Sequence, residues 1–319
     1  MKNQNTTHIA IMGFGTVGSG VYEVLIRNVA GINKKCQGGL NVKRILVNKD
    51  IQHPAQAVFT KDFDDILHDP DITIVVESIG GLDPVYDYTK ALLSHGKSVV
   101  TSNKEMVATH GPELLALAKK NNARYLLEAS VGGGIPIIRP IMQCLAANPI
   151  TEIQGILNGT TNYILTRMFK NGESFAHALK LAQENGYAEK DPTADIEGHD
   201  TCRKIAILSA LAFGRPVHWE DIPTTGITHI TPADAQAAEA QGCVLKLIGS
   251  AKLENDRVIC KVEPTLVPKE SPLATVDDVY NGIIVRGDFV GDVMFYGRGA
   301  GKLPTASAVV ADIMDIVAG

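Results

Sequence analysis

The sequence has no run of basic residues, no apolar stretch of membrane-spanning length and no leader-like N-terminus. Without a Lys/Arg run, the electrostatic footprint of a nucleic-acid-binding protein is missing. No stretch reaches the roughly 18 apolar residues that a membrane span needs, and no apolar core or cleavage site marks a signal peptide. We therefore expect a cytoplasmic protein without nucleic-acid or membrane partners.

The cysteines also lack the spacing of metal ligands. No two of them form a C-x-x-C pair, and no histidine pair accompanies them at zinc-finger spacing. This pattern favours buried, reduced thiols in a cytosolic protein. The five cysteines are Cys36, Cys144, Cys202, Cys243 and Cys260.

The length and composition are those of a globular protein. At roughly 100–200 residues per domain, a chain of 319 residues suggests two domains. Hydrophobic residues make up 45% of the chain and charged residues 20%, with a net charge of −5. These values allow sizeable apolar cores.

A glycine-rich turn follows a short β-type run from His8 to Met12 and precedes an amphipathic helical pattern. This is G-x-G-x-x-G in a strand–turn–helix context, and it predicts a dinucleotide site with the helix N-terminus facing the pyrophosphate. The first glycine allows the tight turn, the second lets the backbone approach the anion, and the third lets the helix pack closely. A glycine turn without a ligand is the alternative. The predicted cofactor contacts here are Gly13, Phe14, Gly15, Thr16, Val17 and Gly18.

Strands and helices alternate through the rest of the N-terminal half. Further strands are predicted at 42–50, 72–81, 97–101 and 123–130. The alternation predicts an α/β fold with a Rossmann-type doubly wound parallel sheet over residues 1–134. Ligands of such sheets lie at the carboxyl ends of the strands. This rule adds Ile79, Gly80, Thr101, Ser102, Asn103 and Lys104 to the predicted cofactor contacts.

The end of the second strand bears on the choice between NAD and NADP. NAD-binding units usually place an acid there, which bonds the ribose 2′-hydroxyl. Here the strand ends in Asn48 and Lys49, and Asp50 follows. Lys49 can neutralise a 2′-phosphate, so we favour NADP with contacts from Asn48 and Lys49. A solvated turn lysine with NAD as cofactor is the alternative.

The pattern changes after about residue 135, where a strand leads through the turn NGTTNY into a helix. Thr160 or Thr161 is the predicted N-cap of this helix. Free N–H groups in such a turn can also bind a carboxylate, and capping alone is as compatible with the sequence.

A charged stretch, GYAEKDPTADIEGHDTCRK at residues 186–204, separates two apolar helices. Asp200 and Lys204 are four residues apart, and an ordinary i,i+4 ion pair would contribute about 0.2–0.5 kcal/mol. The acids Glu189, Asp195 and Asp200 precede a helix with an apolar face, which favours a second interpretation. Carboxylates there suit a substrate ammonium group, and a lysine suits a developing alkoxide.

Several motifs taken together resemble those of homoserine dehydrogenases over almost the whole chain. The resemblance implies an NAD(P)-dependent oxidoreductase acting on CH–OH. Its substrates would be L-homoserine and L-aspartate 4-semialdehyde, on the route to threonine and methionine, and it would be a homodimer. The motifs are GFGTVGSGV, VVESIGG, VVTSNKEM, EASVGGGIPII, ILNGTTNYIL, the charged stretch and YGRGAGKLPTASAVVADI.

The resemblance also implies roles for single residues. Lys204, Lys104 and Asp195 would be catalytic, and we favour Lys204 over Lys104 as the proton donor because Lys104 would lie beside the nicotinamide. Glu189 and Asp200 would hold the substrate, with Gly159, Thr160 and Tyr187 as neighbours. Gly299 and Gly301 would lie near the cofactor, and a helix from about residue 305 would return to the dinucleotide domain. Residues 135–299 would then form an α+β domain for substrate binding, catalysis and dimerisation.

A monovalent cation, expected to be sodium, is implied near the junction of the domains. Its ligands would be the Glu128 side chain and the backbone carbonyls of Val131, Gly133 and Ile135. Hard oxygen ligands around one carboxylate suit an alkali ion. The residues by themselves favour a simpler interpretation, with glycines for close approach and a hydrogen-bonded glutamate.

Two further expectations follow from the resemblance. Many relatives continue into a C-terminal regulatory domain, so we expect this chain to be a short form that lacks threonine feedback through such a domain. The alternatives to the main interpretation are a dehydrogenase of another small amino-aldehyde or hydroxy acid and a non-catalytic nucleotide sensor. The presence of both lysines and the full acid set argues against the sensor.

Overall fold

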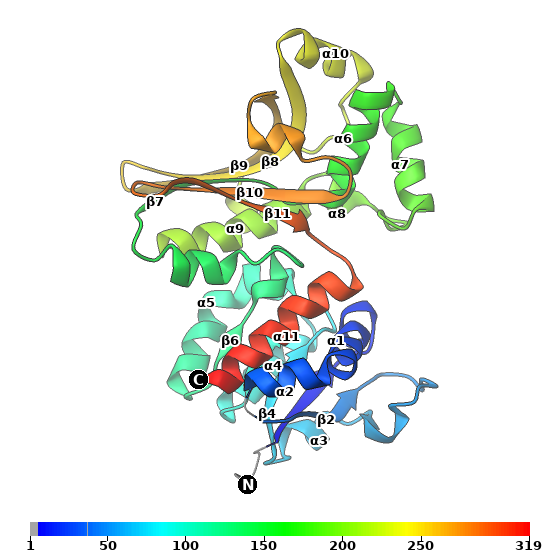
Figure 1. Cartoon of the computed structure of the whole chain (residues 1–319), viewed down its shortest axis with the longest axis vertical. Helices are drawn as coiled ribbons and strands as arrows, with labels where there is room; N and C mark the ends of the chain where they lie inside the picture. The colour runs from blue at the N-terminus through cyan, green and yellow to red at the C-terminus, as the bar shows by residue number, and fades with distance from the viewer. Residues whose placement is uncertain (1–5, 37) are drawn as a thin grey trace. The chain divides into compact units, whose positions relative to one another are not determined.

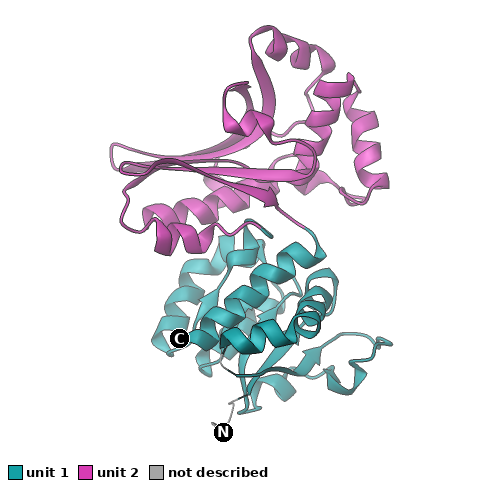
Figure 2. Cartoon of the chain, in the orientation of Figure 1, with its two compact units in different colours: residues 1–134, 301–319 teal, residues 135–300 magenta. Residues whose placement is uncertain are grey.

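A computed structural model describes residues 6–36 and 38–319 of the chain. Contacts divide it into two compact units (Figure 2). Unit 1 combines residues 1–134 with 301–319, and unit 2 is residues 135–300. Of the described helices, none has the length and apolar character that crossing a membrane requires.

Unit 1 contains a parallel six-stranded sheet with the order β3-β2-β1-β4-β5-β6. This order is the one of dinucleotide-binding Rossmann folds, and the strand order reverses between β1 and β4. The predicted doubly wound sheet is therefore confirmed. Its strands are β1 Thr7–Met12, β2 Leu40–Leu46, β3 Phe59–Thr60, β4 Ile72–Glu77, β5 Ser98–Thr101 and β6 Tyr125–Leu126.

The central strands β1 and β4 are apolar on both faces because helices cover both sides of a parallel sheet. The helices of this unit are α1 Thr16–Arg27, α2 Val29–Cys36, α3 Asp64–Leu67, α4 Val85–Ser94, α5 Lys104–Lys120 and α11 Lys302–Ala318. Short 3₁₀ turns are η1 Gln56–Val58 and η2 Glu128–Ser130.

The C-terminal helix α11 packs against α1 within unit 1 (Figure 1), which confirms the predicted return to the dinucleotide fold. Its Val309 and Ile313 share one core with Val21 and Leu25 of α1. The close approach requires a glycine, since a Cβ on Gly20 would lie 2.8 Å from the carbonyl oxygen of Lys302.

The predicted strand at 123–130 is wrong in its length. Only Tyr125 and Leu126 pair with β5, and the chain then turns into η2. The reason lies outside the local sequence: the Glu128 N–H donates to the buried Asp312 carboxylate of α11 at 3.0 Å, and the Ser130 hydroxyl donates back to the Leu127 carbonyl at 2.6 Å. Side-chain partners of this kind compete with the sheet for backbone groups.

Unit 2 contains an antiparallel five-stranded sheet with the order β11-β10-β7-β8-β9. Its strands are β7 Ile150–Ile156, β8 Cys243–Glu254, β9 Arg257–Pro268, β10 Tyr280–Gly287 and β11 Gly291–Arg298. Its helices are α6 Gly159–Asn171, α7 Phe175–Glu184, α8 Thr193–Ile196, α9 His199–Phe213 and α10 Pro232–Ala240. Shorter turns are η3 Pro140–Cys144, which is π-helical, η4 Trp219–Asp221 and η5 Pro272–Thr275.

Helix α9 carries the end of the charged stretch and lies against the sheet of unit 2. A glycine in β8 allows the contact, because a Cβ on Gly249 would lie 2.9 Å from Cγ2 of Thr201. The first turns of α9 are consequently buried, and Gly214 ends the helix in the left-handed conformation, with φ of +64°.

The predicted N-cap of α6 is wrong. Neither Thr160 nor Thr161 caps the helix; the Asn158 side chain does, accepting a hydrogen bond from the Thr161 N–H at 2.8 Å. Asparagine is as good an N-cap as serine or threonine, and here it stands one residue before the helix.

Candidate functional site

The glycine turn of unit 1 has the geometry that its spacing predicts. Gly13 has φ of +91°, and a Cβ there would lie 3.0 Å from the backbone of Ser78. A Cβ on Gly18 would lie 2.1 Å from the carbonyl oxygen of Gly13. At Gly15, by contrast, a Cβ would meet nothing within 4 Å. The first and third glycines are thus required by packing, and the second faces open space.

The N-terminus of α1 opens onto the same space. Gly15 is its N-cap and makes no side-chain capping bond, and the first turn carries no acid. The N–H groups of a helix start carry partial positive charge. This end of α1 is therefore suited to an anion such as a pyrophosphate.

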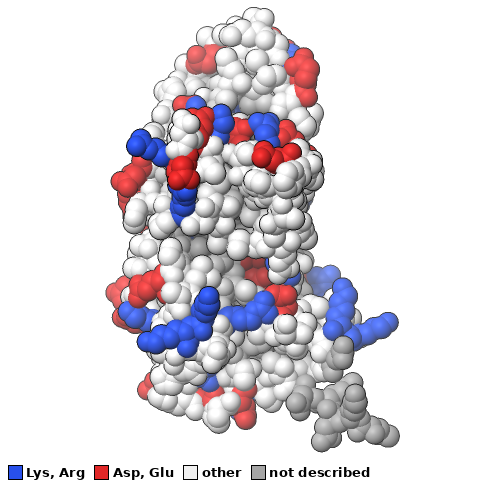
Figure 3. Space-filling model, turned by 90° about the vertical axis from the view of Figure 1, so that its left-hand side faces the viewer, with Lys and Arg blue, Asp and Glu red and all other residues white. Residues whose placement is uncertain are grey.

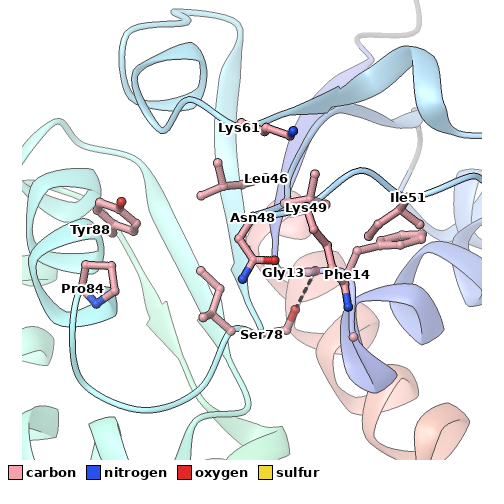
Figure 4. Close-up of a pocket in the computed structure, with 13 residues that line it drawn as sticks. Gly13, Phe14, Leu46, Asn48, Lys49, Ile51, Lys61, Ser78, Pro84 and Tyr88 are labelled. Atoms are coloured by element: carbon pink, nitrogen blue, oxygen red, sulfur yellow. Dashed lines mark hydrogen bonds between the residues drawn. The ribbon is translucent and has the colours of Figure 1, made fainter.

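A cavity of about 470 Å³ lies in front of this turn (Figure 4). Its size is in the range of small-molecule sites. In Figure 4, Asn48, Lys49 and Ser78 converge on the glycine turn, and Pro84 and Tyr88 line the opposite wall. The lining residues are Gly13, Phe14, Gly15, Leu46, Val47, Asn48, Lys49, Ile51, Lys61, Ser78, Ile79, Pro84 and Tyr88.

Six predicted cofactor contacts are among these lining residues: Gly13, Phe14, Gly15, Asn48, Lys49 and Ile79. The sequence interpretation missed Lys61, which follows β3 and pairs with Asp50 at 2.8 Å. The structure brings Lys61 to the cavity because β3 pairs with β2 in parallel and ends at the same sheet edge. Lys61 is a second cation in the wall of this cavity, in addition to Lys49.

Among the remaining predicted contacts, Thr16, Val17 and Gly18 form the start of α1. Another group lies at the ends of β4 and β5: Gly80, Thr101, Ser102, Asn103 and Lys104. Asn103 caps α5 by accepting from the Met106 N–H at 3.1 Å, and its amide donates to the Gly81 carbonyl at 2.7 Å. Ser102 and Lys104 flank Asn103, and Lys104 is the first residue of α5. The two loops that follow β4 and β5 are thereby joined.

The charged stretch in unit 2 contains a buried ion pair. The Lys204 Nζ lies 2.8 Å from Oδ2 of Asp200, and their side chains are 8% and 3% exposed. The same ammonium donates to the Leu157 carbonyl at 2.7 Å. The small free energy of an exposed i,i+4 pair does not apply to two charges that have lost their water.

Asn158 connects this ion pair to a second acid, and the sequence interpretation missed it. Its amide donates to Oδ1 of Asp195 at 2.7 Å and to Oδ2 of Asp200 at 2.9 Å. The same side chain caps α6. The turn NGTTNY was the available signal, but it pointed to the threonines.

Of the predicted substrate neighbours, Thr160 and Tyr187 are in contact. Thr160 donates to the Tyr187 carbonyl at 2.7 Å, and a Cβ on Gly159 would lie 2.7 Å from the carbonyl oxygen of Val279. Glu189 lies on the exposed part of the loop, where its carbonyl accepts from Gln183. Asp195 and Asp200, by contrast, are connected by the Asn158 amide, which donates to both.

The predicted cation ligands form a buried segment. Glu128, Val131 and Ile135 are 3%, 1% and 2% exposed, and Gly133 has φ of +56°. One carboxylate with backbone carbonyls is a hard oxygen set that fits an alkali ion. Over residues 6–36 and 38–319, no group of three or more His, Cys, Asp and Glu could hold a metal ion by itself.

The two late glycines differ in their surroundings. A Cβ on Gly299 would lie 1.9 Å from the amide of Asn281 in unit 2, which explains that glycine by packing. Gly301 has φ of +121° and starts α11 in unit 1. Their contact with a cofactor stays a prediction.

Comparisons with known proteins follow the same division of the chain. A family model described as homoserine dehydrogenase matches residues 136–314, and one described as homoserine dehydrogenase, NAD binding domain, matches residues 13–128. The chain belongs to the homoserine dehydrogenase family. It is therefore an NAD(P)-dependent oxidoreductase of the homoserine dehydrogenase type.

Individual relatives agree over nearly the whole chain. The homoserine dehydrogenase of Synechocystis sp. is 46% identical over 98% of this chain and 73% of its own length. That of Bacillus subtilis is 40% identical over 97% and 72%.

Solved structures agree as well. A homoserine dehydrogenase from Thiobacillus denitrificans has a TM-score of 0.94 at 42% identity, covering 98% of this chain and 74% of that one. A hyperthermophilic archaeal homoserine dehydrogenase in complex with NADPH has a TM-score of 0.82 at 28% identity, covering 98% and 97%.

Proposed function

We propose that this chain interconverts L-homoserine and L-aspartate 4-semialdehyde by hydride transfer, with Lys204 as the proton donor. Unit 1 binds the nucleotide cofactor, and unit 2 binds the substrate and carries the proton-donating lysine. The observation that carries the proposal is the buried Lys204 ammonium, held by Asp200 and the Leu157 carbonyl. An ammonium has three hydrogens, and these two acceptors use two of them.

The third hydrogen is suited to the reacting oxygen of the substrate. In the reductive direction, the bound reduced cofactor would supply hydride to the aldehyde carbon, and negative charge would develop on the carbonyl oxygen. The lysine stabilises that negative charge and transfers a proton to it, which gives the alcohol. In the oxidative direction the amine of Lys204 takes the hydroxyl proton, and the oxidised cofactor would accept the hydride from the same carbon.

The acids of the charged stretch bind the amino group of the substrate. Glu189 is exposed and available to an incoming ammonium, and Asp195 lies close to Asp200 through their shared donor Asn158. Asp200, which pairs with Lys204, is also proposed to belong to this acid set. Gly159, Thr160 and Tyr187 form the neighbouring wall. Lys104 supports the reaction from the cofactor side.

NADP is the proposed cofactor, with NAD as the weaker one. The support is the pair Lys49 and Lys61 in the cavity wall at the β2 end of the sheet, where the adenosine ribose binds in this fold. Lys49→Ala and Lys61→Ala should each raise the KM for NADP about tenfold through loss of a charge-assisted bond, and leave that for NAD unchanged. Lys35→Ala on the exposed side of α2 is the control. Equal effects on both cofactors would contradict the proposal.

A monovalent cation, sodium in the first instance, is proposed at Glu128 with the carbonyls of Val131, Gly133 and Ile135. The support is the oxygen set of this buried segment, because one carboxylate with backbone carbonyls suits an alkali ion. Such an ion would order this segment of chain. Glu128→Gln should remove the dependence of thermal stability on added sodium, and an unchanged sodium dependence would exclude this site.

The central test is oxidation of L-homoserine by the purified chain with NADP and NAD in parallel. Lys204→Ala should lose turnover by at least about a hundredfold, since general acid–base catalysis contributes roughly 10²–10⁴-fold, while cofactor binding stays intact. Lys180→Ala, on the exposed face of α7, is the matched control. Full turnover in Lys204→Ala would remove this lysine from the mechanism, and no wild-type turnover with either cofactor would refute the activity.

A further inference from the structure

The side chain of Glu77 is a buried acid at the edge where the cofactor binds. It is the last residue of β4 and is 1% exposed. Oε1 accepts hydrogen bonds from the N–H groups of Ile79 at 2.9 Å and Gly80 at 3.2 Å. Oε2 accepts from the Thr101 hydroxyl of β5 at 2.6 Å. One carboxylate thus holds the ends of two neighbouring strands.

Further hydrogen bonds connect the loop after β5 back to the loop after β4. The Thr101 hydroxyl oxygen accepts from the Asn103 N–H at 2.9 Å, and the Asn103 amide donates to the Gly81 carbonyl at 2.7 Å. The loop after β4 is therefore joined to the loop after β5 at both of its ends. Glu77 is the only charged group among these bonded partners.

The loop after β4 needs such support. Gly80 and Gly81 have φ of +86° and +72°, and a Cβ on either would meet nothing within 4 Å. Two glycines in the left-handed region have many alternative conformations, so the observed one must be held by other groups. Open space in front of both lets a ligand approach the backbone.

The topology says which part of the cofactor these loops face. In this fold the dinucleotide lies across the point where the strand order reverses, here between β1 and β4, and its adenosine ribose lies at the end of β2. The nicotinamide half must then lie on the side of β4 and β5. The loops joined by Glu77 are on that side.

We propose that Glu77 is a positioning residue for the nicotinamide half of the cofactor, which it serves by fixing the loops Ile79–Gly81 and Thr101–Asn103 without touching the cofactor. The inference rests on the proposed function and names a residue outside the predicted site. An amide cannot replace the acid. The Nε2 of a glutamine would donate toward the Thr101 hydroxyl, which would lose its acceptor.

The chemical surroundings support a role beyond stability. Burial raises the pKa of Glu77, while its hydrogen bonds from Thr101, Gly80 and Ile79 oppose the rise. Tyr125 of β6 faces the same charge, and its own burial followed by the charge of Glu77 raises the pKa of its hydroxyl. A buried carboxylate held by neutral donors costs free energy, which is typical of a group retained for a site.

The test separates the two halves of the cofactor. Glu77→Gln is compared with wild type for binding of the whole oxidised cofactor and of its adenosine fragment. The fragment is 2′,5′-ADP if the wild type uses NADP and ADP if it uses NAD. We expect affinity for the whole cofactor and kcat/KM for homoserine to fall about tenfold to a hundredfold, as for the loss of a hydrogen bond to a charged group. Affinity for the fragment should stay within about twofold.

Two variants complete the design. Thr101→Val removes the Thr101–Glu77 hydrogen bond from its other end. It should also lower affinity for the whole cofactor and leave affinity for the fragment unchanged. This variant keeps the inference testable if Glu77→Gln does not fold. Glu113→Gln changes an exposed acid of α5 in the same unit and should change neither affinity. Whole-cofactor affinity and turnover equal to wild type in Glu77→Gln would overturn the inference. So would equal losses for fragment and whole cofactor, which indicate a general folding role.

Failure of the proposed function has a different result. A wild-type chain that binds neither cofactor, or does not oxidise homoserine, refutes the activity before any variant is compared. A wild type that is active beside an unaltered Glu77→Gln refutes only the role of Glu77.

Discussion

Asp200 and Lys204 lie one turn apart on α9, and Oδ2 of the acid is 2.8 Å from Nζ of the lysine. Both side chains are buried, and the ammonium also bonds the Leu157 carbonyl. A second i,i+4 pair in the chain, Lys180 with Glu184 at 3.7 Å, is exposed. The two pairs have the same spacing in sequence and differ in burial, which makes them a natural comparison.

Breaking the buried pair should cost far more stability than breaking the exposed one. Asp200→Asn leaves the ammonium of Lys204 buried without its counter-charge, so the free energy of unfolding should fall by about 3–5 kcal/mol. Glu184→Gln should change it by less than about 0.5 kcal/mol. Urea denaturation measures both. Adding Lys204→Met to Asp200→Asn should restore stability without restoring activity, and equal losses in the two single variants would contradict this.

Asn158 should separate into a capping role and a bridging role. Asn158→Ala removes the N-cap of α6 and the donor shared by Asp195 and Asp200, so it should lower stability by about 1 kcal/mol and raise the KM for homoserine. Asn158→Ser keeps a capping oxygen and loses the amide. It should recover the stability and retain the raised KM, whereas recovery of both would show that bridging is unimportant.

Gly15 and Gly18 should respond differently to the same added methyl group. A Cβ on Gly15 meets nothing within 4 Å, but one on Gly18 lies 2.1 Å from the carbonyl oxygen of Gly13. Gly15→Ala should therefore keep its thermal stability and lose cofactor affinity, because the methyl occupies the approach to the pyrophosphate. Gly18→Ala should lose stability even without cofactor. Melting temperature and cofactor titration distinguish the two variants. Cofactor binding by Gly15→Ala at wild-type affinity would show that the pyrophosphate does not bind at this turn.

Glu77 should give stability an unusual dependence on pH. Because burial raises its pKa above the usual 4.5, the folded chain holds this proton more tightly than the unfolded chain. Its contribution to stability is then present at acidic pH and is lost as the pH rises through the raised pKa. Glu77→Gln cannot ionise, so its stability relative to wild type should increase as the pH is raised from about 5 toward the alkaline range. Melting temperatures of both proteins across this range test the prediction. A variant that becomes less stable than wild type as the pH rises would contradict it.

Local patterns predicted most of unit 1. The G-x-G-x-x-G turn, the alternating strands and the return of the last helix all follow from periodicity, turn chemistry and family resemblance. The shortness of β6 does not, because the acceptor for the Glu128 N–H is Asp312, far along the chain. The sequence around β6 does not contain Asp312, so local patterns there cannot predict where the strand ends.

The charged site shows the same limit. The spacing of Asp200 and Lys204 predicts that they meet, but their burial depends on Gly249, which lets α9 approach β8. The role of Asn158 could not be predicted because it depends on Asp195 and Asp200, which only the folded chain places within hydrogen-bond distance of its amide. Lys61 lines the cavity because β3 pairs with β2. A strand of two residues is too short to be predicted from the sequence.

The packing of α11 on α1 has a consequence for synthesis. Val21 and Leu25 emerge from the ribosome early, yet their core partners Val309 and Ile313 follow only after the whole of unit 2. At about 5–20 residues per second, the nucleotide-binding core remains incomplete for many seconds while unit 2 is free to fold first. Unit 1 is begun first on the ribosome, but its core cannot be completed until unit 2 has been translated.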